Sequence, residues 1–381
     1  MAKGTFDTHI ITHIIILRFL FYYVFFVRTG GYREACRSII IKMKILFYPE
    51  LYFYTLEVYM VLKIFHDICS WLVSFCGSVF MIFAIVSAII VLIERFLYSV
   101  HKKDPASFET WKNEPAGTPS RRIALITGAS SGLGRKLALN IDQKEKNIDE
   151  IWLVARRRDR LDALASALTH KTHVLPLDLT SPDSFGIIES ELEKYNAEVG
   201  VLINCAGLGK IGNYQAITIE ETDRMMELND RSAVDVTVTA LPFMKQGDRI
   251  IEICSTAAFQ PLQHFNVYAA SKSFLYNYSR ALRMELLPRR IAVTAACPYW
   301  MQDTEFIPVA RDTKTDPTHK NPIRHFPFSS SSDDVARRIM RASRRGYAVS
   351  TPGIFCTIHR FFAKLMPREV LMFFWEGLRR V

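Results

Sequence analysis

The chain has 381 residues, of which 49% are hydrophobic and 23% are charged, and its net charge is +10. This length and apolar content exclude a disordered chain and a minimal module, because they supply a large core with a long segment left over. The basic excess is uneven: residues 121–336 carry 26 Lys and Arg against 27 Asp and Glu, whereas residues 337–381 carry 10 against 2. No nucleic-acid recognition motif accompanies it, so we expect no nucleic-acid partner.

Residues 1–100 are predicted to form a membrane-anchor region. Residues 68–93 contain no charged side chain over 26 positions. As a helix they would extend about 39 Å, more than the roughly 30 Å hydrocarbon core of a bilayer, so we expect a tilted transmembrane helix rather than a buried core helix. Residues 9–27 are a candidate second span, but Arg18 at their centre costs about 2.5 to 3.5 kcal/mol in a membrane. A signal-like or interfacial segment is one alternative for this stretch. Another is that it is the product of an upstream start codon, with Met43 or Met60 as the true beginning.

Residues 101–120 are rich in Pro, Gly, Ser, Thr and charges, which predicts a linker. Beyond it, apolar strands alternate with helices. Strands are predicted at 122–126, 151–155, 173–177, 199–204, 249–254 and 291–297, and helices at 133–146, 159–168, 182–195, through 229–241, and at 268–286. Fully apolar strands between helices are typical of α/β proteins, so we expect a Rossmann-like doubly wound parallel sheet.

A glycine-rich turn, Thr127-Gly128-Ala129-Ser130-Ser131-Gly132-Leu133-Gly134, joins the first of these strands to the first helix. Its glycines let backbone amides and the helix N-terminus approach a pyrophosphate. At the end of the second strand, where an NAD-binding fold places an acid, this chain has Ala155-Arg156-Arg157-Arg158. Guanidinium groups there favour a 2′-phosphate, which predicts NADP(H) rather than NAD(H).

Tyr268 and Lys272 are four residues apart on one predicted helix, so they share a face on which an ammonium can acidify a phenol. Ser255 follows an apolar strand thirteen residues before Tyr268. Together with the glycine turn, these residues resemble the short-chain dehydrogenase/reductase family over about residues 121–350. Pro298-Tyr299 is similar to the membrane-anchored branch that includes the 17-beta-hydroxysteroid dehydrogenases and the very-long-chain 3-oxoacyl-CoA reductases.

The resemblance implies a catalytic set of Asn229, Ser255, Tyr268 and Lys272. Tyr268 would protonate the reduced carbonyl and Ser255 would hydrogen-bond its oxygen. Lys272, together with the positive charge of the oxidised cofactor, would lower the pKa of Tyr268. Lys272 would also hold the nicotinamide ribose, while Asn229 would interrupt its helix to position a water. The residues implied to bind NADP(H) are Gly128, Ser130, Ser131, Gly132, Leu133, Gly134, Arg156, Arg157, Asp178, Leu179, Asn204, Ala206, Gly207, Tyr268, Lys272, Pro298 and Thr304. No metal is expected.

Two stretches lie beyond these motifs. Residues 305–328 are rich in Pro, His and aromatics and are predicted to be a loop that covers the substrate. Residues 351–381 form a basic amphipathic segment, which suits a helix on an anionic membrane surface or aromatic side chains that close the substrate pocket. The seven cysteines show no spacing of a zinc or disulfide framework and are expected to be reduced.

We therefore expect NADPH-dependent reduction of a lipophilic ketone to a secondary alcohol, or the reverse oxidation, with a steroid ketone or a long 3-oxoacyl thioester as substrate. The alternative is a membrane-bound NADP(H)-sensing regulator or scaffold without turnover, which the presence of both Tyr268 and Lys272 disfavours. Lys and Arg flank residues 68–93 almost equally, so the positive-inside rule does not orient the helix. We expect a membrane protein with its catalytic domain in the cytosol, where its soluble cofactor is. The resemblance implies a homodimer.

Overall fold

The computed structural model describes Ser78, Met81, Ile85, residues 121–312, Ile323 and residues 329–380. The chain divides into two units, Met1–Glu94 and Arg95–Val381. Within the described residues, no helix combines the length and the apolarity that crossing a membrane requires. The predicted spans at 9–27 and 68–93 lie outside the described residues, apart from the three isolated ones, and so does the predicted linker at 101–120.

The second unit is built on a parallel sheet of seven strands in the order β3-β2-β1-β4-β5-β6-β7. The strands are β1 Arg121–Thr127, β2 Glu150–Val154, β3 Lys171–Leu175, β4 Ala197–Asn204, β5 Arg249–Ile253, β6 Ala292–Ala296 and β7 Val349–Ser350. The order of connection runs from β1 outward to β3, returns to β4, and then proceeds outward to β7. This arrangement is the predicted Rossmann-like, doubly wound parallel sheet.

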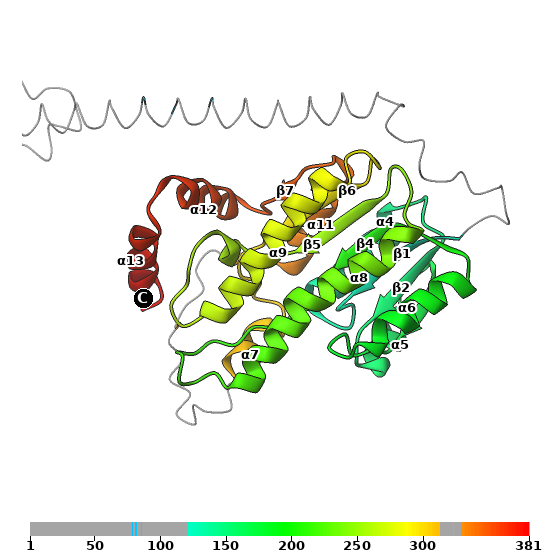
Figure 1. Cartoon of the computed structure of the whole chain (residues 1–381), viewed down its shortest axis with the longest axis horizontal. Helices are drawn as coiled ribbons and strands as arrows, with labels where there is room; N and C mark the ends of the chain where they lie inside the picture. Colours follow the sequence, from blue (N-terminus) through cyan, green and yellow to red (C-terminus); the bar gives the residue numbers. More distant parts are fainter. Residues whose placement is uncertain are drawn as a thin grey trace, which may run out of the picture. The chain divides into compact units, whose positions relative to one another are not determined.

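Helices cover both faces of this sheet (Figure 1). They are α4 Gly132–Lys144, α5 Arg158–Ala165, α6 Asp183–Lys194, α7 Ile219–Met226, α8 Ser232–Ala240, α9 Asn266–Glu285, α10 Phe306–Arg311, α11 Ser332–Arg344, α12 Ile354–Leu365 and α13 Arg368–Leu378. Buried side chains of α4, α5 and α11 pack on one face, and those of α6, α8 and α9 pack on the other. The result is three layers, with the strands in the middle.

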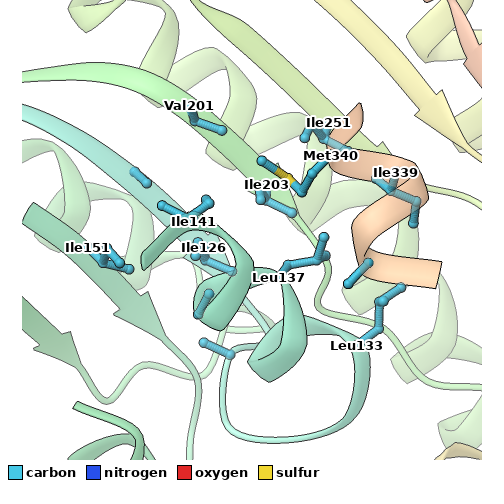
Figure 2. Packing of buried hydrophobic residues seen from close by; sticks show 14 of the residues in the cluster. Ile126, Leu133, Leu137, Ile141, Ile151, Val201, Ile203, Ile251, Ile339 and Met340 are labelled. Carbon is cyan, nitrogen blue, oxygen red and sulfur yellow. The ribbon is translucent and has the colours of Figure 1, made fainter. Parts of the chain in front are cut away.

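The packing on the first face shows why the apolar strands are buried. Figure 2 shows Leu133, Leu137 and Ile141, which α4 presents at helical spacing, against side chains from the central strands and from α11. Leu137 and Ile141 are completely buried. Burying each such side chain contributes about 1.5 to 3 kcal/mol, so this layer holds the glycine turn at the start of α4 firmly in place.

Two predicted elements differ from the structure in an instructive way. The strand expected at 173–177 ends at Leu175, because Pro176 has no amide hydrogen to continue the ladder. The predicted helix through Asn229 is divided into α7, a π-helical turn at Glu227–Arg231 and α8. Asn229 therefore interrupts its helix as predicted. The prediction also omitted β7 and α11.

A carboxyl group is buried at the centre of the sheet. The side chain of Glu252, on β5, has no solvent exposure. Its Oε1 accepts hydrogen bonds from Asn204 Nδ2 at 3.0 Å and from Thr237 Oγ1 at 2.9 Å. Burial is the main cause that raises the pKa of Glu252 to about 7. This network joins β4, β5 and α8 beneath the carboxyl edge of the sheet.

We expect Gly134→Ala to destabilise the fold by about 1 to 3 kcal/mol, because a Cβ at Gly134 would lie 2.3 Å from the carbonyl oxygen of Gly128. The matched control is Gly186→Ala on α6, where a Cβ would meet nothing within 4 Å. That change should stabilise the helix by about 0.5 to 1 kcal/mol. Chemical denaturation of both variants measures the difference, and equal effects would contradict the packing described here.

We expect the stability of the wild type to fall with rising pH relative to Glu252→Gln. Because the folded-state pKa of about 7 lies above the ordinary value of 4.5, the contribution of Glu252 is complete below that ordinary value. It is lost as pH rises through the folded-state pKa. The free energy of unfolding of the wild type should drop by about 2 to 3 kcal/mol relative to the variant between about pH 5 and pH 8. Parallel pH profiles from denaturant titrations would contradict this account.

Candidate active site

A cavity of about 980 Å³ lies along the carboxyl edge of the sheet. Its lining includes residues one or two positions after strands, among them Gly128 after β1, Ala155 after β2, Ala206 after β4 and Ser255 after β5. In open α/β sheets, ligands bind at this edge beside the point where the strand order reverses. Here that point lies between β1 and β4.

The glycine turn forms one end of the cavity. Gly128 has a φ of +68°, and a Cβ there would lie 2.8 Å from the backbone nitrogen of Ala206, so only glycine lets the turn pass this close to the loop after β4. Thr127 Oγ1 accepts hydrogen bonds from the amides of Cys205 and Ala206 at 3.0 and 3.1 Å. Thr304 completes this end, since a Cβ at Gly132 would lie 3.5 Å from its side chain.

The arginines predicted at the end of β2 reach this turn. Arg157 Nη2 donates to Ser131 Oγ at 2.8 Å and to Ser130 Oγ at 3.1 Å. Arg156 Nη1 lies 3.8 Å from Asp178 Oδ2, and both residues line the cavity. A closely approachable backbone, a helix N-terminus and guanidinium groups are a donor set that fits a phosphorylated nucleotide.

Tyr268, Ser255 and Lys272 meet at the end of β5. The phenol of Tyr268 is hydrogen-bonded to the side chain of Ser255, and Ser255 Oγ also accepts from the amide of Ala257 at 3.1 Å. Lys272 Nζ donates to the carbonyl of Ile253 at 2.9 Å and lies 5.9 Å from the centroid of the Tyr268 ring. The phenol therefore points toward the serine and into the cleft.

Burial dominates the electrostatics of this group. It raises the pKa of the Tyr268 phenol and lowers the pKa of the Lys272 ammonium. Desolvation of a buried phenolate is the largest influence on the pKa of Tyr268 in the protein alone. The lowering expected from Lys272 together with the oxidised cofactor stays a prediction. Tyr268 stays protonated near neutral pH, as a proton donor to a developing alkoxide must.

Two predicted site residues do not line the cavity. Asn229 is completely buried, and its side chain bonds to the backbone of Leu208 at 2.8 and 2.9 Å and to Ser271 Oγ at 3.0 Å. Asn204 points into the core, where its amide donates to the Ala233 carbonyl, Thr237 Oγ1 and Glu252 Oε1. Every other predicted catalytic or cofactor residue lies in the lining.

The far end of the cavity is apolar and is formed by the C-terminal helices. Its lining there consists of Phe355, Ile358, His359, Phe362, Met366, Leu371, Phe374, Trp375 and Leu378. Trp375 anchors this wall, because its Nε1 donates to the carbonyl of Gln263 at 3.0 Å. Ile358, Phe362 and Phe374 are 48%, 42% and 60% exposed and so border the mouth. Aromatic side chains of the tail therefore line the pocket, as one of the two interpretations of this segment predicts.

One polar pair interrupts this apolar end, and sequence reasoning missed it. His359 Nε2 lies 2.9 Å from Gln260 Oε1, and both side chains line the cavity. Burial lowers the pKa of His359 to about 4, so the ring is neutral at physiological pH. The two residues are 99 positions apart, and neither belongs to a recognisable motif.

The predicted loop at 305–328 begins instead with a helix, α10 at Phe306–Arg311. The ring of Phe306 lies 5.4 Å from the ring of Tyr268, measured between centroids. Residues 313–322 and 324–328 lie outside the described part of the chain. The described part of this segment thus packs directly on the predicted catalytic tyrosine.

Comparison with known proteins gives consistent results. The family model described as short chain dehydrogenase matches residues 122–315. The 3-ketodihydrosphingosine reductase of Mus musculus is 26% identical over 250 residues, which are 63% of this chain and 73% of the relative. The serine 3-dehydrogenase of Agrobacterium fabrum is 31% identical over 226 residues, which are 56% of this chain and 85% of the relative.

A solved structure is also similar. It is a short-chain dehydrogenase from Sphingobium yanoikuyae in complex with NADPH, with a TM-score of 0.55 and 28% identity over 66% of this chain and 94% of that chain. The family match covers half of the sequence and coincides with the sheet that carries the cavity. The chain therefore belongs to the short chain dehydrogenase family and is an oxidoreductase that acts on CH–OH groups.

Proposed function

We propose that this protein uses NADPH to reduce a lipophilic ketone to a secondary alcohol, with the reverse oxidation open to the same site. The observation that carries the proposal is the layout of one cavity. Arg156 and Arg157 lie at one end, Tyr268 and Ser255 in the middle, and a wall of aromatic and aliphatic side chains at the other end. Such a layout suits a phosphorylated dinucleotide that meets an apolar substrate at the phenol.

The relatives support each half of this proposal. The bacterial dehydrogenase with the similar fold was solved in complex with NADPH. The mouse relative is a reductase of 3-ketodihydrosphingosine, and an Arabidopsis thaliana relative, 29% identical over 60% of this chain and 72% of its own length, is 11-beta-hydroxysteroid dehydrogenase-like 2. Sphingoid bases and steroids are both lipophilic.

The proposed reduction divides the chemistry between cofactor and protein. NADPH, when bound, supplies the hydride. Tyr268 then donates its proton to the substrate oxygen, while Ser255 holds that oxygen by a hydrogen bond. The positive charge of Lys272 stabilises the phenolate left on Tyr268, and its buried position keeps this interaction strong.

Asn229 acts on this set indirectly in our proposal. Its side chain bonds to Leu208 and to Ser271, which is one residue before Lys272. It thereby ties the loop after β4 to the helix that bears Tyr268. We assign it a positioning role through these bonds and through the π-helical turn around it.

The apolar end of the cavity also supports the finer parts of the proposal. The exposed side chains at its mouth extend along α12 and α13 with Ile354, Leu365 and Phe373, as expected of a surface that meets lipid. We propose a membrane-associated enzyme with residues 68–93 as its anchor and a cytosolic catalytic domain, similar to the steroid and long-chain acyl branch.

We further propose a homodimer that pairs through α8 and α9, whose Val238 and Phe274 are exposed.

We expect Tyr268→Phe to lower kcat with hydrophobic ketones by about 10² to 10⁴-fold, because it removes the proton donor. The dissociation constant for NADPH should stay within a few-fold of wild type. The assay follows NADPH consumption by absorbance over a panel of hydrophobic ketones, with Tyr276→Phe on the same helix as the matched control. Equal rates in wild type and Tyr268→Phe would defeat the enzymatic proposal and favour a sensor without turnover.

We expect Phe374→Ser to lower kcat/KM for a long-chain ketone by about 10-fold, because less apolar surface of the substrate is buried in the complex. The kcat/KM for a short, soluble ketone should stay nearly unchanged. Phe373→Ser is the control, since Phe373 is 78% exposed and is absent from the cavity lining. Steady-state kinetics in lipid-free buffer separate this effect from membrane binding. Equal losses for both ketones would contradict a substrate site at this end.

A further inference from the structure

We propose that Glu305 competes with the 2′-phosphate of NADP(H) for Arg157 and Arg160, so that this carboxylate sets how strongly the protein prefers the phosphorylated cofactor. The inference rests on the proposed function, because it concerns the NADP(H) end of the same cavity. Nothing in the local sequence pattern pairs Glu305 with these arginines, since it lies 148 and 145 residues away from them.

The carboxylate bridges the two arginines. Glu305 Oε2 lies 3.0 Å from Arg157 Nη1, and Oε1 lies 2.5 Å from Arg160 Nη1. Hydrogen bonds from Arg160 and Arg157 hold the pKa of Glu305 below its usual value, so it is anionic at neutral pH. The side chains of Glu305, Arg157 and Arg160 are 47%, 41% and 41% exposed, and an incoming ligand can therefore reach them.

The remaining donors of Arg157 face the glycine turn. Its Nε and Nη2 donate to Ser130 Oγ, and Nη2 also donates to Ser131 Oγ. A phosphate that approaches Arg157 beside this turn meets a guanidinium whose outer nitrogen already holds a carboxylate. Two anions bound to one guanidinium repel each other. Phosphate and carboxylate groups also bind to the same kind of planar pair of N–H donors. Binding of either anion therefore weakens the contact of the other with Arg157.

Arg160 makes the competition stronger than a single pair would. Arg157 is the N-cap of α5 and Arg160 lies in its first turn, and both guanidinium groups contact the Glu305 carboxylate. Arg160 is absent from the cavity lining, and sequence reasoning did not single it out. When Glu305 leaves, both arginines become available to a group that carries nearly two negative charges.

Release of Glu305 also affects the segment that packs on Tyr268. Glu305 directly precedes α10, and the next residue, Phe306, packs its ring on Tyr268. The other end of α10 stays bonded, because the carbonyl of Ala310 accepts from the amide of Ile211 at 2.7 Å. Binding of the 2′-phosphate thus frees the end of α10 that lies beside the proposed proton donor. By reciprocity, a substrate that moves α10 away from Arg157 strengthens NADP(H) binding.

The test compares NADP⁺ and NAD⁺ binding by calorimetry on the full chain. Glu305→Gln should tighten NADP⁺ binding by about 3- to 10-fold, as expected for removal of a competing exposed ion pair. It should leave NAD⁺ binding unchanged, because NAD⁺ has no 2′-phosphate. The gain should shrink as salt is raised.

Glu376→Gln is a matched control. Glu376 also pairs with two arginines, Arg379 and Arg380, but it lies on α13 outside the cavity lining. The variant removes the same charge from the chain and should change neither affinity.

In the wild type, hydrogen exchange at the first turn of α10 should rise with saturating NADP⁺ and stay constant with NAD⁺.

The outcomes separate the two proposals. If wild type binds NAD⁺ as tightly as NADP⁺, the proposed cofactor preference fails, and the inference fails with it. If wild type prefers NADP⁺ but Glu305→Gln leaves NADP⁺ binding unchanged or weakens it, only the competition is overturned. Tightening of both nucleotides alike would also overturn it, because the effect would then not involve the 2′-phosphate.

Discussion

The parallel pairing of β1 with β4 is the constraint on which the site depends. Because these neighbours run in the same direction, the turn after β1 and the loop after β4 leave the sheet at one edge and then diverge. Thr127 holds the two loops together through the amides of Cys205 and Ala206, and Gly128 lets their backbones touch. The other residues that line the cavity surround this junction. Tyr268 lines the same cavity from α9.

Burial then decides what the reaction centre can do. The same desolvation raises the pKa of the Tyr268 phenol and lowers that of the Lys272 ammonium, so burial makes the charged form of each group less favourable than it is in water. A charge on either one must be matched by an opposite charge that develops during reaction. Glu252, whose pKa burial also raises, adds a third such group on β5, the strand that precedes Ser255. The centre is thus an apolar region in which small charge changes have large energetic effects.

The sequence predicted the features that depend on local spacing. Apolar runs located the six longer strands, and the glycine spacing located the turn. The four-residue separation of Tyr268 and Lys272 predicted that both lie on one helix, which is α9. Contacts between distant residues could not be read in this way. The contacts of Glu305 with Arg157 and of His359 with Gln260 depend on how the loops and the C-terminal helices pack against the rest of the domain. Asn204 was placed on the right strand, yet its side chain turns to the core because Glu252 and Thr237 offer it partners there.

The wall formed by α12 and α13 comes from the last thirty residues or so of the chain, whereas the nucleotide half comes from loops of the sheet. In the proposed enzyme, substrate selectivity and redox chemistry therefore depend on different stretches of the sequence. In that enzyme, exchange of α12 and α13 between relatives is a route to new substrates, provided that the exchange keeps Trp375 in the hydrophobic cluster that contains Tyr268.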